Sequence, residues 1–380
     1  MPRTSTARPR ARPRPAPRRR VARARPPSPA MVRDSLGLLR RLSEASGVSG
    51  DESAVRQIVL ETLRNKVEDV QVDALGNVLV RARAGARRGL RVMLAAHMDE
   101  VGLMVIGVTA EGMLKFDPVG GVNERTLMAK PVLIGRARVS GVIGSPPPHL
   151  IEWQDEPGPY NIATLAIDIG ARSKEEALQR VRPGDGVVFA TRFERLGAVL
   201  RGKALDDRVG VATLIELVLD PPPGIELMAA FTTQEEVGLR GAAVAAHALD
   251  PQAAIVLDCT PANDLPLWDG SENTTYNTRL GSGPAIYVGD RGTLPSPRFV
   301  EHLVRTAESA GLPYQRRQPG SGSTDAAAIH LARKGIPSIS LSVPGRYLHT
   351  PLSMILFDDW RASAALVRAA LTRLRLENIR

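Results

Sequence analysis

Four apolar runs of strand length organise this sequence, and each is followed by a histidine or a carboxylate. The runs are Arg91–Ala96, Ile225–Thr232, Ala253–Leu257 and Ile336–Val343. The polar residues at or just beyond their ends are His97, Glu235, Glu236, Asp258 and His349. Strands that alternate with helices build an open α/β sheet, and the carboxyl ends of its parallel strands share one edge. The sequence therefore predicts an α/β protein with these polar residues gathered at one sheet edge.

Amphipathic patterns around these runs predict the helices. We expect helices over residues 32–42, after a cap at Ser49–Asp51, after Arg208, and at about 297–311, 325–333 and 357–376. The second of these carries Val55, Ile58, Val59 and Leu63 at three-to-four spacing, as the buried face of a helix requires. Alternating valines at 70 and 72, a turn at 74–77 and the run 78–83 predict a β-hairpin.

The predicted secondary structure changes between residues 104 and 194. Short strand-like stretches and frequent glycines replace the helical patterns, at 113–116, 132–139, 161–169 and 187–193. One short helix interrupts them, because Ser173 and Glu176 form a capping box. We expect a small β-barrel inserted into the α/β domain, which itself comprises residues 31–103 and 195–380.

The net charge of +10 comes from the amino-terminal extension. Residues 1–30 hold ten of the 50 basic residues and no acid, which leaves 40 basic against 40 acidic residues in the body. A neutral body argues against a surface that follows nucleic-acid phosphates. The extension is rich in Arg and Pro without apolar periodicity, so we expect it to be disordered.

Three roles compete for this extension: a basic tail for nucleic acid or acidic lipid, a targeting segment, or an upstream piece outside the working protein. It lacks the apolar core of a secretory signal, and its prolines oppose the amphipathic helix of a transit peptide. We favour Met31 as the functional start, since foldable sequence begins there. Intact-mass measurement of protein from its native source tests this, and a mass that includes residues 1–30 rejects it.

The single cysteine, Cys259, cannot form an internal disulfide, so nothing in the sequence requires an oxidising compartment. The apolar runs are of strand length and fall short of the roughly 20 residues that cross a bilayer. We therefore expect a soluble, cytoplasmic protein with no membrane partner.

Two histidines and at least three carboxylates at one sheet edge, with no cysteine, suit two divalent ions such as Zn, Co or Mn. Within that set, Asp99 can hold one ring nitrogen of His97 while the other nitrogen faces a metal. Each short motif also has an ordinary structural interpretation: a Glu-Glu pair after a strand is commonly a solvated turn. We interpret His247, His302, His330 and Cys259 as structural residues.

Six motifs in order carry a resemblance to a known family. They are AHMDEVG at 96–102, GKALDDRVG at 202–210, TTQEEVGLRGA at 232–242, VLD at 256–258, GSTDAAAI at 322–329 and SVPGRYLHTP at 342–351. From about Met31 to the carboxyl terminus, the chain resembles the tetrahedral aminopeptidases, co-catalytic metallopeptidases that include glutamyl and deblocking aminopeptidases. The resemblance implies a zinc-peptidase-like catalytic domain with a central mixed sheet flanked by helices.

The resemblance also implies roles for individual residues. Asp206 would bridge two divalent metal ions, with His97 and Asp258 completing one site and Glu236 and His349 the other. Glu235 would be the general base that activates a metal-bridging water to release amino-terminal residues from peptides. Asp99 would orient His97, and the Asp206–Asp207 peptide bond would be cis. Because Glu235 fits the role of catalytic acid better than Glu100 does, we expect Glu100 to be structural or to support a metal ligand from behind.

The family assembles into tetrahedral dodecamers through the inserted domain, so we expect homo-oligomerisation through residues 104–194. His149, in that domain, is open between a role in a neighbouring subunit's active site and a role in the barrel. Two other functions compete: an inactive or regulatory relative, and nucleic-acid binding through the basic tail. Paired-carboxylate glycosidases do not use two co-catalytic metals, so a glycosidase is disfavoured. The motifs do not define the metal or the side-chain preference.

Overall fold

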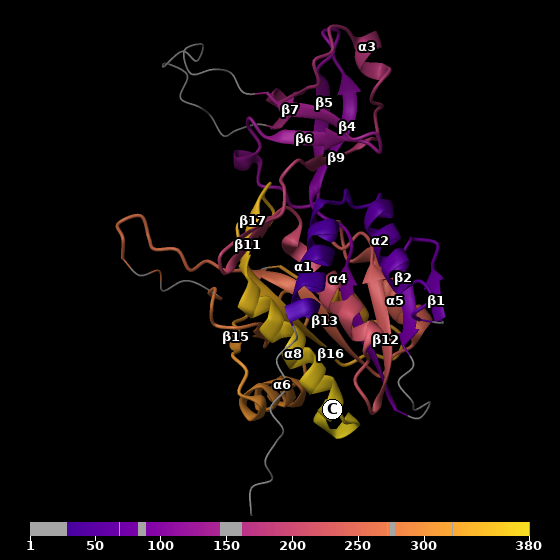
Figure 1. The fold of residues 1–380 in the computed structure, drawn as a ribbon, viewed down its shortest axis with the longest axis vertical. Helices are drawn as coiled ribbons and strands as arrows, with labels where there is room; N and C mark the ends of the chain where they lie inside the picture. The colour runs from indigo at the N-terminus through magenta and orange to yellow at the C-terminus, as the bar shows by residue number, and fades with distance from the viewer. Residues whose placement is uncertain are drawn as a thin grey trace, which may run out of the picture.

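The fold is that of a computed structural model, which describes residues 29–67, 69–82, 89–144, 162–271, 273, 278–320 and 322–379. The Arg/Pro-rich extension lies outside the described residues up to position 28, and so does His149. Figure 1 shows a helix-covered sheet with a small barrel standing at one end of it.

The large sheet is mixed, as the resemblance implies. Its main path runs β1 (Asp69–Val72), β2 (Val78–Ala82), β12 (Ile225–Thr232), β3 (Leu90–His97), β13 (Ala253–Pro261), β16 (Ser338–Arg346), β17 (Ser353–Leu356), β11 (Val199–Gly202) and β10 (Glu194–Leu196). Beside it, β14 (Ala285–Tyr287) pairs with β16 and with β15 (Gln315–Arg317). The central strands β12, β3, β13 and β16 are parallel, so their carboxyl ends share one edge.

Helices cover both faces of this sheet because its central strands are apolar on both sides. One face packs on α1 (Pro29–Glu44), α2 (Ser53–Leu63), α4 (Leu205–Leu219), α6 (Pro297–Ala310) and α8 (Phe357–Arg373). The other packs on α5 (Arg240–Leu249) and α7 (Ala326–Ile329). Alternate residues of β3 enter the two cores: Leu94 belongs to the first and Met93 to the second.

A closed barrel interrupts the α/β domain between β3 and β10. Its strands are β4 (Gly102–Val108), β5 (Leu114–Val119), β6 (Pro131–Ile134), β7 (Val139–Ile143), β8 (Ile167–Asp168) and β9 (Gly186–Phe189). The barrel has its own apolar core, which includes Leu103, Phe116 and Ile167. The helix α3 (Lys174–Leu178) begins at the predicted cap, where the Ser173 hydroxyl accepts a hydrogen bond from the amide of Glu176.

Several predicted elements differ from the observed ones. The single strand expected at 132–139 is two strands, β6 and β7, joined by a turn at Gly135–Arg138. Residues 161–169 contain a 3-10 turn (Ile162–Thr164) before the two-residue β8, and α7 ends at Ile329 instead of residue 333. The strand β13 continues beyond Asp258 to Pro261, so Asp258 lies within it.

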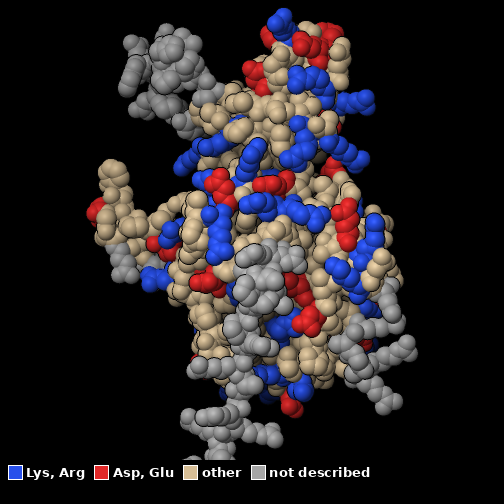
Figure 2. Space-filling view, in the orientation of Figure 1, with Lys and Arg blue, Asp and Glu red and all other residues tan. Residues whose placement is uncertain are grey.

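Charged side chains of both signs are interspersed over the α/β body on the face in Figure 2, and basic ones gather where the barrel meets the body. Among the described residues, no helix is long and apolar enough to cross a membrane.

Candidate active site

The seven polar residues singled out from the sequence meet at the carboxyl edge of the parallel strands. His97 is the last residue of β3 and pairs in register with Thr232, the last residue of β12. The turn after β12 carries Glu235 and Glu236, and His349 follows β16. Asp258 projects from β13, and Asp206 lies in the first turn of α4. Side chains far apart in the sequence thus reach one place.

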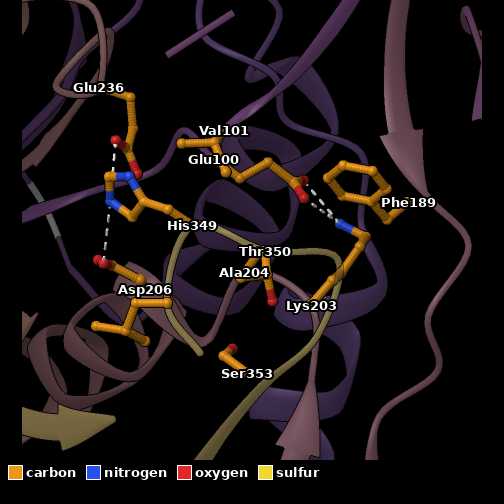
Figure 3. Close-up of a pocket in the computed structure, with 11 residues that line it drawn as sticks. Glu100, Val101, Phe189, Lys203, Ala204, Asp206, Glu236, His349, Thr350 and Ser353 are labelled. Atoms are coloured by element: carbon orange, nitrogen blue, oxygen red, sulfur yellow. Dashed lines mark hydrogen bonds and ion pairs between the residues drawn. The ribbon is translucent and has the colours of Figure 1, made fainter. Parts of the chain in front are cut away.

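Asp206 lies between the two histidines. Its Oδ1 is 3.2 Å from Nε2 of His97, and its Oδ2 is 3.8 Å from Nε2 of His349. Asp258 Oδ1 lies 3.9 Å from Nε2 of His97, and Glu236 Oε2 lies 3.4 Å from Nε2 of His349. Figure 3 shows His349 between Glu236 and Asp206.

Ligand-type atoms form three compact groups, each within 4.8 Å. The groups are His97 with Asp206 and Asp258; Asp206 with Glu236 and His349; and His97 with Glu235 and Glu236. The first two groups share Asp206. Each of these two contains one imidazole and two carboxylates, which is a donor set able to hold a divalent cation.

The backbone around Asp206 departs from a regular helix start. Ala204 has a left-handed φ of 52°, and both Asp206 and Asp207 have non-helical backbone angles. The peptide bond between these two aspartates is cis, as the resemblance implies. Gly210 leaves room for the Asp207 carboxylate, because a Cβ there would lie 2.3 Å from Asp207 Oδ2. This backbone directs the Asp206 side chain toward the two histidines.

Asp99 is completely buried and links several parts of the site. Its carboxylate accepts hydrogen bonds from the amides of Glu235 at 3.0 Å and Glu236 at 3.1 Å, and from the Ser49 hydroxyl at 2.6 Å. Its Oδ1 also lies 3.5 Å from Nδ1 of His97. One carboxylate therefore holds the turn after β12 against the end of β3.

Ser49 does not cap a helix, contrary to the prediction. The N-cap of α2 is Glu52, and the Ser49 hydroxyl points to Asp99 instead. A buried carboxylate that must be satisfied attracts this hydroxyl more strongly than the start of a helix does. Sequence reasoning missed this contact because Asp99 lies 50 residues away.

The inserted barrel also reaches the site, a contact that the sequence did not reveal. After β5, the Gly121 carbonyl lies 3.0 Å from Nδ1 of His349, and the amide of Asn123 donates to the His349 carbonyl at 3.2 Å. A Cβ on Gly121 would lie 3.1 Å from Nδ1 of His349, and one on Gly120 would lie 3.2 Å from Cβ of Glu236. The adjacent glycines in the sequence were the only signal of this close approach.

Burial and mutual repulsion shape the pKa values of the acids. Burial, followed by the charges of Asp206 and Asp207, raises the pKa of Asp258 well above its usual value. Burial also raises the pKa of Glu235 well above its ordinary range, opposed by His97 and reinforced by nearby carboxylates. Burial, opposed by His349 and reinforced by Asp206, raises the pKa of Glu236 to about 7.

The neighbouring carboxylates also raise the pKa values of the two histidines. Burial alone would lower the pKa of His97, but Asp206 and Asp99 hold it well above its usual value. Burial also opposes protonation of His349, yet Glu236 and Asp206 raise its pKa. The pKa of Asp206 is lowered, since its contacts with the two histidines outweigh burial. The site is therefore an acid-rich cluster that attracts positive charge.

Asp325 is a further buried acid that the sequence motif contained but gave no role. Its Oδ2 accepts a hydrogen bond from the Thr232 hydroxyl at 2.5 Å, whereas its buried Oδ1 has no hydrogen-bond partner. Burial raises the pKa of Asp325 to about 6. Its charge also helps to raise the pKa of Glu235.

A small cleft opens beside Asp206, Glu236 and His349 (Figure 3). Glu100 and Lys203 line its inner end. Glu100 is buried and bound to Lys203, in keeping with the structural role expected for it. His302 and His330 bond backbone carbonyls of Ala370 and Ala326 away from the cleft.

Comparison with known proteins assigns the chain to a class. A family model described as M42 glutamyl aminopeptidase matches residues 76–366. The lysyl aminopeptidase of Pyrococcus furiosus is 32% identical over 346 residues, which cover 89% of this chain and 97% of that protein. These matches define a peptidase of the aminopeptidase class.

Solved structures agree with the sequence matches. A TET aminopeptidase from the archaeon Thaumarchaeota archaeon SCGC AB-539-E09 is 34% identical, with a TM-score of 0.85 over 91% of this chain and 98% of that one. The TET1 peptidase of Pyrococcus horikoshii, described as able to assemble into a tetrahedron or a large octahedral shell, is 33% identical. Its TM-score is 0.78 over 90% of this chain and 100% of that one. The chain belongs to the M42 glutamyl aminopeptidase family.

Proposed function

We propose that this protein is a metal-dependent aminopeptidase that holds two divalent cations and removes amino-terminal residues from peptides. His97 and Asp258 would hold one cation, Glu236 and His349 the other, and Asp206 both. The observation that carries the proposal is the position of Asp206, whose two oxygens face different histidines.

The donor set fits two such cations. Each group offers one nitrogen and two carboxylates, a combination that Zn, Co and Mn accept and that does not choose among them. Carboxylates whose pKa is raised by burial and by neighbouring carboxylates, as at Asp258 and Glu236, are stabilised when added positive charge replaces their protons. When bound, divalent cations polarise a substrate carbonyl and lower the pKa of water.

Glu235 is the proposed general base. It would take a proton from the water that attacks the scissile carbonyl, and return it to the nitrogen that leaves as the peptide C–N bond breaks. Its amide is held by Asp99, and burial raises its pKa well above the usual value of a glutamate, which makes the carboxylate a stronger base. Asp99 would serve as the residue that holds His97, Glu235 and Glu236 in register.

The substrate class is a peptide with a free amino terminus. The family description names glutamyl peptides and a 32% identical relative is named for lysyl ones, so the preferred side chain differs in charge among similar chains. We therefore assign no side-chain preference to this protein.

The test is a panel of aminoacyl-anilides with acidic, basic and apolar side chains, assayed with chelator-treated protein before and after Zn²⁺, Co²⁺ or Mn²⁺ is restored. We expect hydrolysis only after a cation is restored, and none of an anilide whose α-amine is acetylated. Undiminished hydrolysis by metal-stripped protein, or equal hydrolysis of the acetylated substrate, would reject the proposal.

We further propose that residues 31–103 and 195–380 form the catalytic domain and that residues 104–194 mediate assembly into a homo-oligomer. The similarity to a peptidase described as forming a tetrahedron or an octahedral shell supports this. Sedimentation should show a large assembly for the whole chain, and a single monomeric species would count against it.

A further inference from the structure

Three buried charged side chains form a cluster behind the proposed metal site. Lys203 Nζ lies 2.7 Å and 2.8 Å from the two carboxylate oxygens of Glu100, and Arg208 Nη2 lies 3.2 Å from Glu100 Oε1. The exposed fractions are 2% for Glu100 and Lys203 and 0% for Arg208. We call these three residues the Glu100 cluster.

The Glu100 cluster includes both ends of the segment 203–208, which carries Asp206. Lys203 begins the segment and Arg208 ends it, and the same Glu100 carboxylate binds both (Figure 3 shows its contact with Lys203). Glu100 directly follows Asp99 and is itself held by a hydrogen bond from its amide to the Gly47 carbonyl at 2.9 Å. The cluster therefore ties the loop of Asp206 to the chain just beyond His97.

Lys203 has no hydrogen left to offer a substrate. Its three ammonium hydrogens are used by the two Glu100 oxygens and by the Ala45 carbonyl, which lies 2.7 Å away. An ammonium carries only three donors. Although Lys203 lines the cleft, it is therefore not a catalytic residue.

The segment needs such anchors because its backbone is irregular. Ala204 is left-handed and neither Asp206 nor Asp207 has helical angles, so a regular helical ladder does not hold the loop. A neutral anchor assists: the buried Ser43 hydroxyl donates to the Lys203 carbonyl at 2.6 Å. Buried ion pairs contribute little net stability, because desolvation offsets their attraction. Stability is thus a weak explanation for three charges placed here.

We propose that Glu100, Lys203 and Arg208 are positioning residues that set the distance between the Asp206 carboxylate and the His97 imidazole. This inference rests on the proposed two-cation site. It predicts that detaching either end of the segment weakens cation binding even when the protein stays folded.

The experiment uses Lys203→Met and Arg208→Met in the full chain. Each substitution leaves one basic side chain, Arg208 or Lys203, paired with Glu100. Neither variant therefore contains a buried charge without a partner. Metal-stripped protein is titrated with Co²⁺, and its affinity and visible absorption spectrum are recorded. We expect about 10–100-fold weaker binding, the usual effect of losing a residue that orients metal ligands, together with a changed spectrum.

Arg361→Met is the matched control. Arg361, in α8, lies 2.9 Å from Glu216, its ion-pair partner in α4. Glu216 lies near the end of α4 opposite to Asp206. This variant should melt at a lower temperature and keep the wild-type Co²⁺ affinity and spectrum. Ser43→Ala is a milder, uncharged change that should weaken Co²⁺ binding about tenfold.

Wild-type Co²⁺ affinity and spectrum in folded Lys203→Met, Arg208→Met or Ser43→Ala would overturn the inference. If the two charge variants fail to fold, Ser43→Ala decides it. Failure of the proposed function would look different: wild-type protein would bind Co²⁺ without hydrolysing any anilide. The comparison of Co²⁺ spectra would remain valid in that case.

Discussion

The Gly121 carbonyl, in the inserted barrel, accepts a hydrogen bond from Nδ1 of His349 at 3.0 Å. A carbonyl oxygen can only accept, so Nδ1 carries the hydrogen and, in the neutral ring, Nε2 presents its lone pair toward Glu236 and Asp206. The barrel thus determines which nitrogen of His349 faces the proposed cation. A domain expected to serve assembly also orients a residue of the site.

Gly121→Ala should disturb this orientation. The new methyl group would lie 3.1 Å from Nδ1 of His349, so the ring must move. We expect about tenfold weaker binding of a cation in the group formed by Asp206, Glu236 and His349. Co²⁺ titration of metal-stripped protein measures this. Gly107→Ala is the control, because a Cβ there meets nothing within 4 Å and the binding should not change.

Glu235→Gln should separate cation binding from turnover. Glutamine keeps the shape of the side chain but cannot accept the proton, so turnover should fall by roughly 10²–10⁴-fold while cations remain bound. The partner variant, Glu236→Gln, should lose cation affinity instead. Metal content after gel filtration and anilide hydrolysis together distinguish them. Wild-type turnover in Glu235→Gln would assign the base to another residue.

The stability of the metal-stripped protein should fall as pH rises. The pKa of Glu236 is raised to about 7 and that of Asp325 to about 6, first by burial. The pKa values of His97 and His349 are also raised, since nearby carboxylates outweigh burial. All four groups bind protons more tightly in the folded state, so their protonation stabilises the fold. This stability is lost as pH rises, through about pH 6 for Asp325 and about pH 7 for Glu236, and above pH 6.5 for the two histidines.

Urea unfolding of chelator-treated protein at several pH values measures this dependence. The slope should be roughly −1.4 kcal/mol per pH unit for each extra proton held by the folded state. The lowered pKa values of Asp99 and Asp206 act only at more acidic pH. Cation-loaded protein should not follow the trend, because bound cations replace these protons and bind more tightly as pH rises. Rising stability of the stripped protein from pH 5 to 7 would contradict the expectation.

Trp360→Ala should be the more damaging of two tryptophan substitutions. Trp360 is completely buried, and its indole donates to the Thr213 hydroxyl at 2.9 Å and the Val209 carbonyl at 3.1 Å. Its loss should lower the free energy of unfolding by about 3–5 kcal/mol. Trp268 is fully exposed, so Trp268→Ala should change the free energy of unfolding by less than about 0.5 kcal/mol. Similar losses for both would mean that Trp268 is covered in solution.

The parallel core of the fold was predictable because it depends on local apolar pattern. The strand Ile225–Thr232 is observed with its predicted ends, and β3 ends at His97 as expected. Convergence of the five polar residues at the strand ends followed from the shared edge of parallel strands. The roles assigned to them stay predictions that the variants above test.

What could not be predicted depends on contacts between distant parts of the chain. The pairing of β10, β11 and β17 extends the sheet through short strands without apolar alternation. Ser49 looked like a helix cap because its true partner, Asp99, is remote in sequence. The partner of Glu100 was equally hidden, because Lys203 lies 103 residues later in the chain. An ion pair between residues so far apart produces no periodic pattern in the sequence.

The order of the site along the chain has a consequence for synthesis. His97 precedes the barrel, whereas His349 follows β16, the last of the four central parallel strands along the chain. A ribosome must therefore make the barrel and all four central strands before the cluster can close around Asp206. An unfinished or prematurely terminated chain that lacks His349 holds an incomplete site. The order of these elements thus prevents the cluster from forming until His349 has been synthesised.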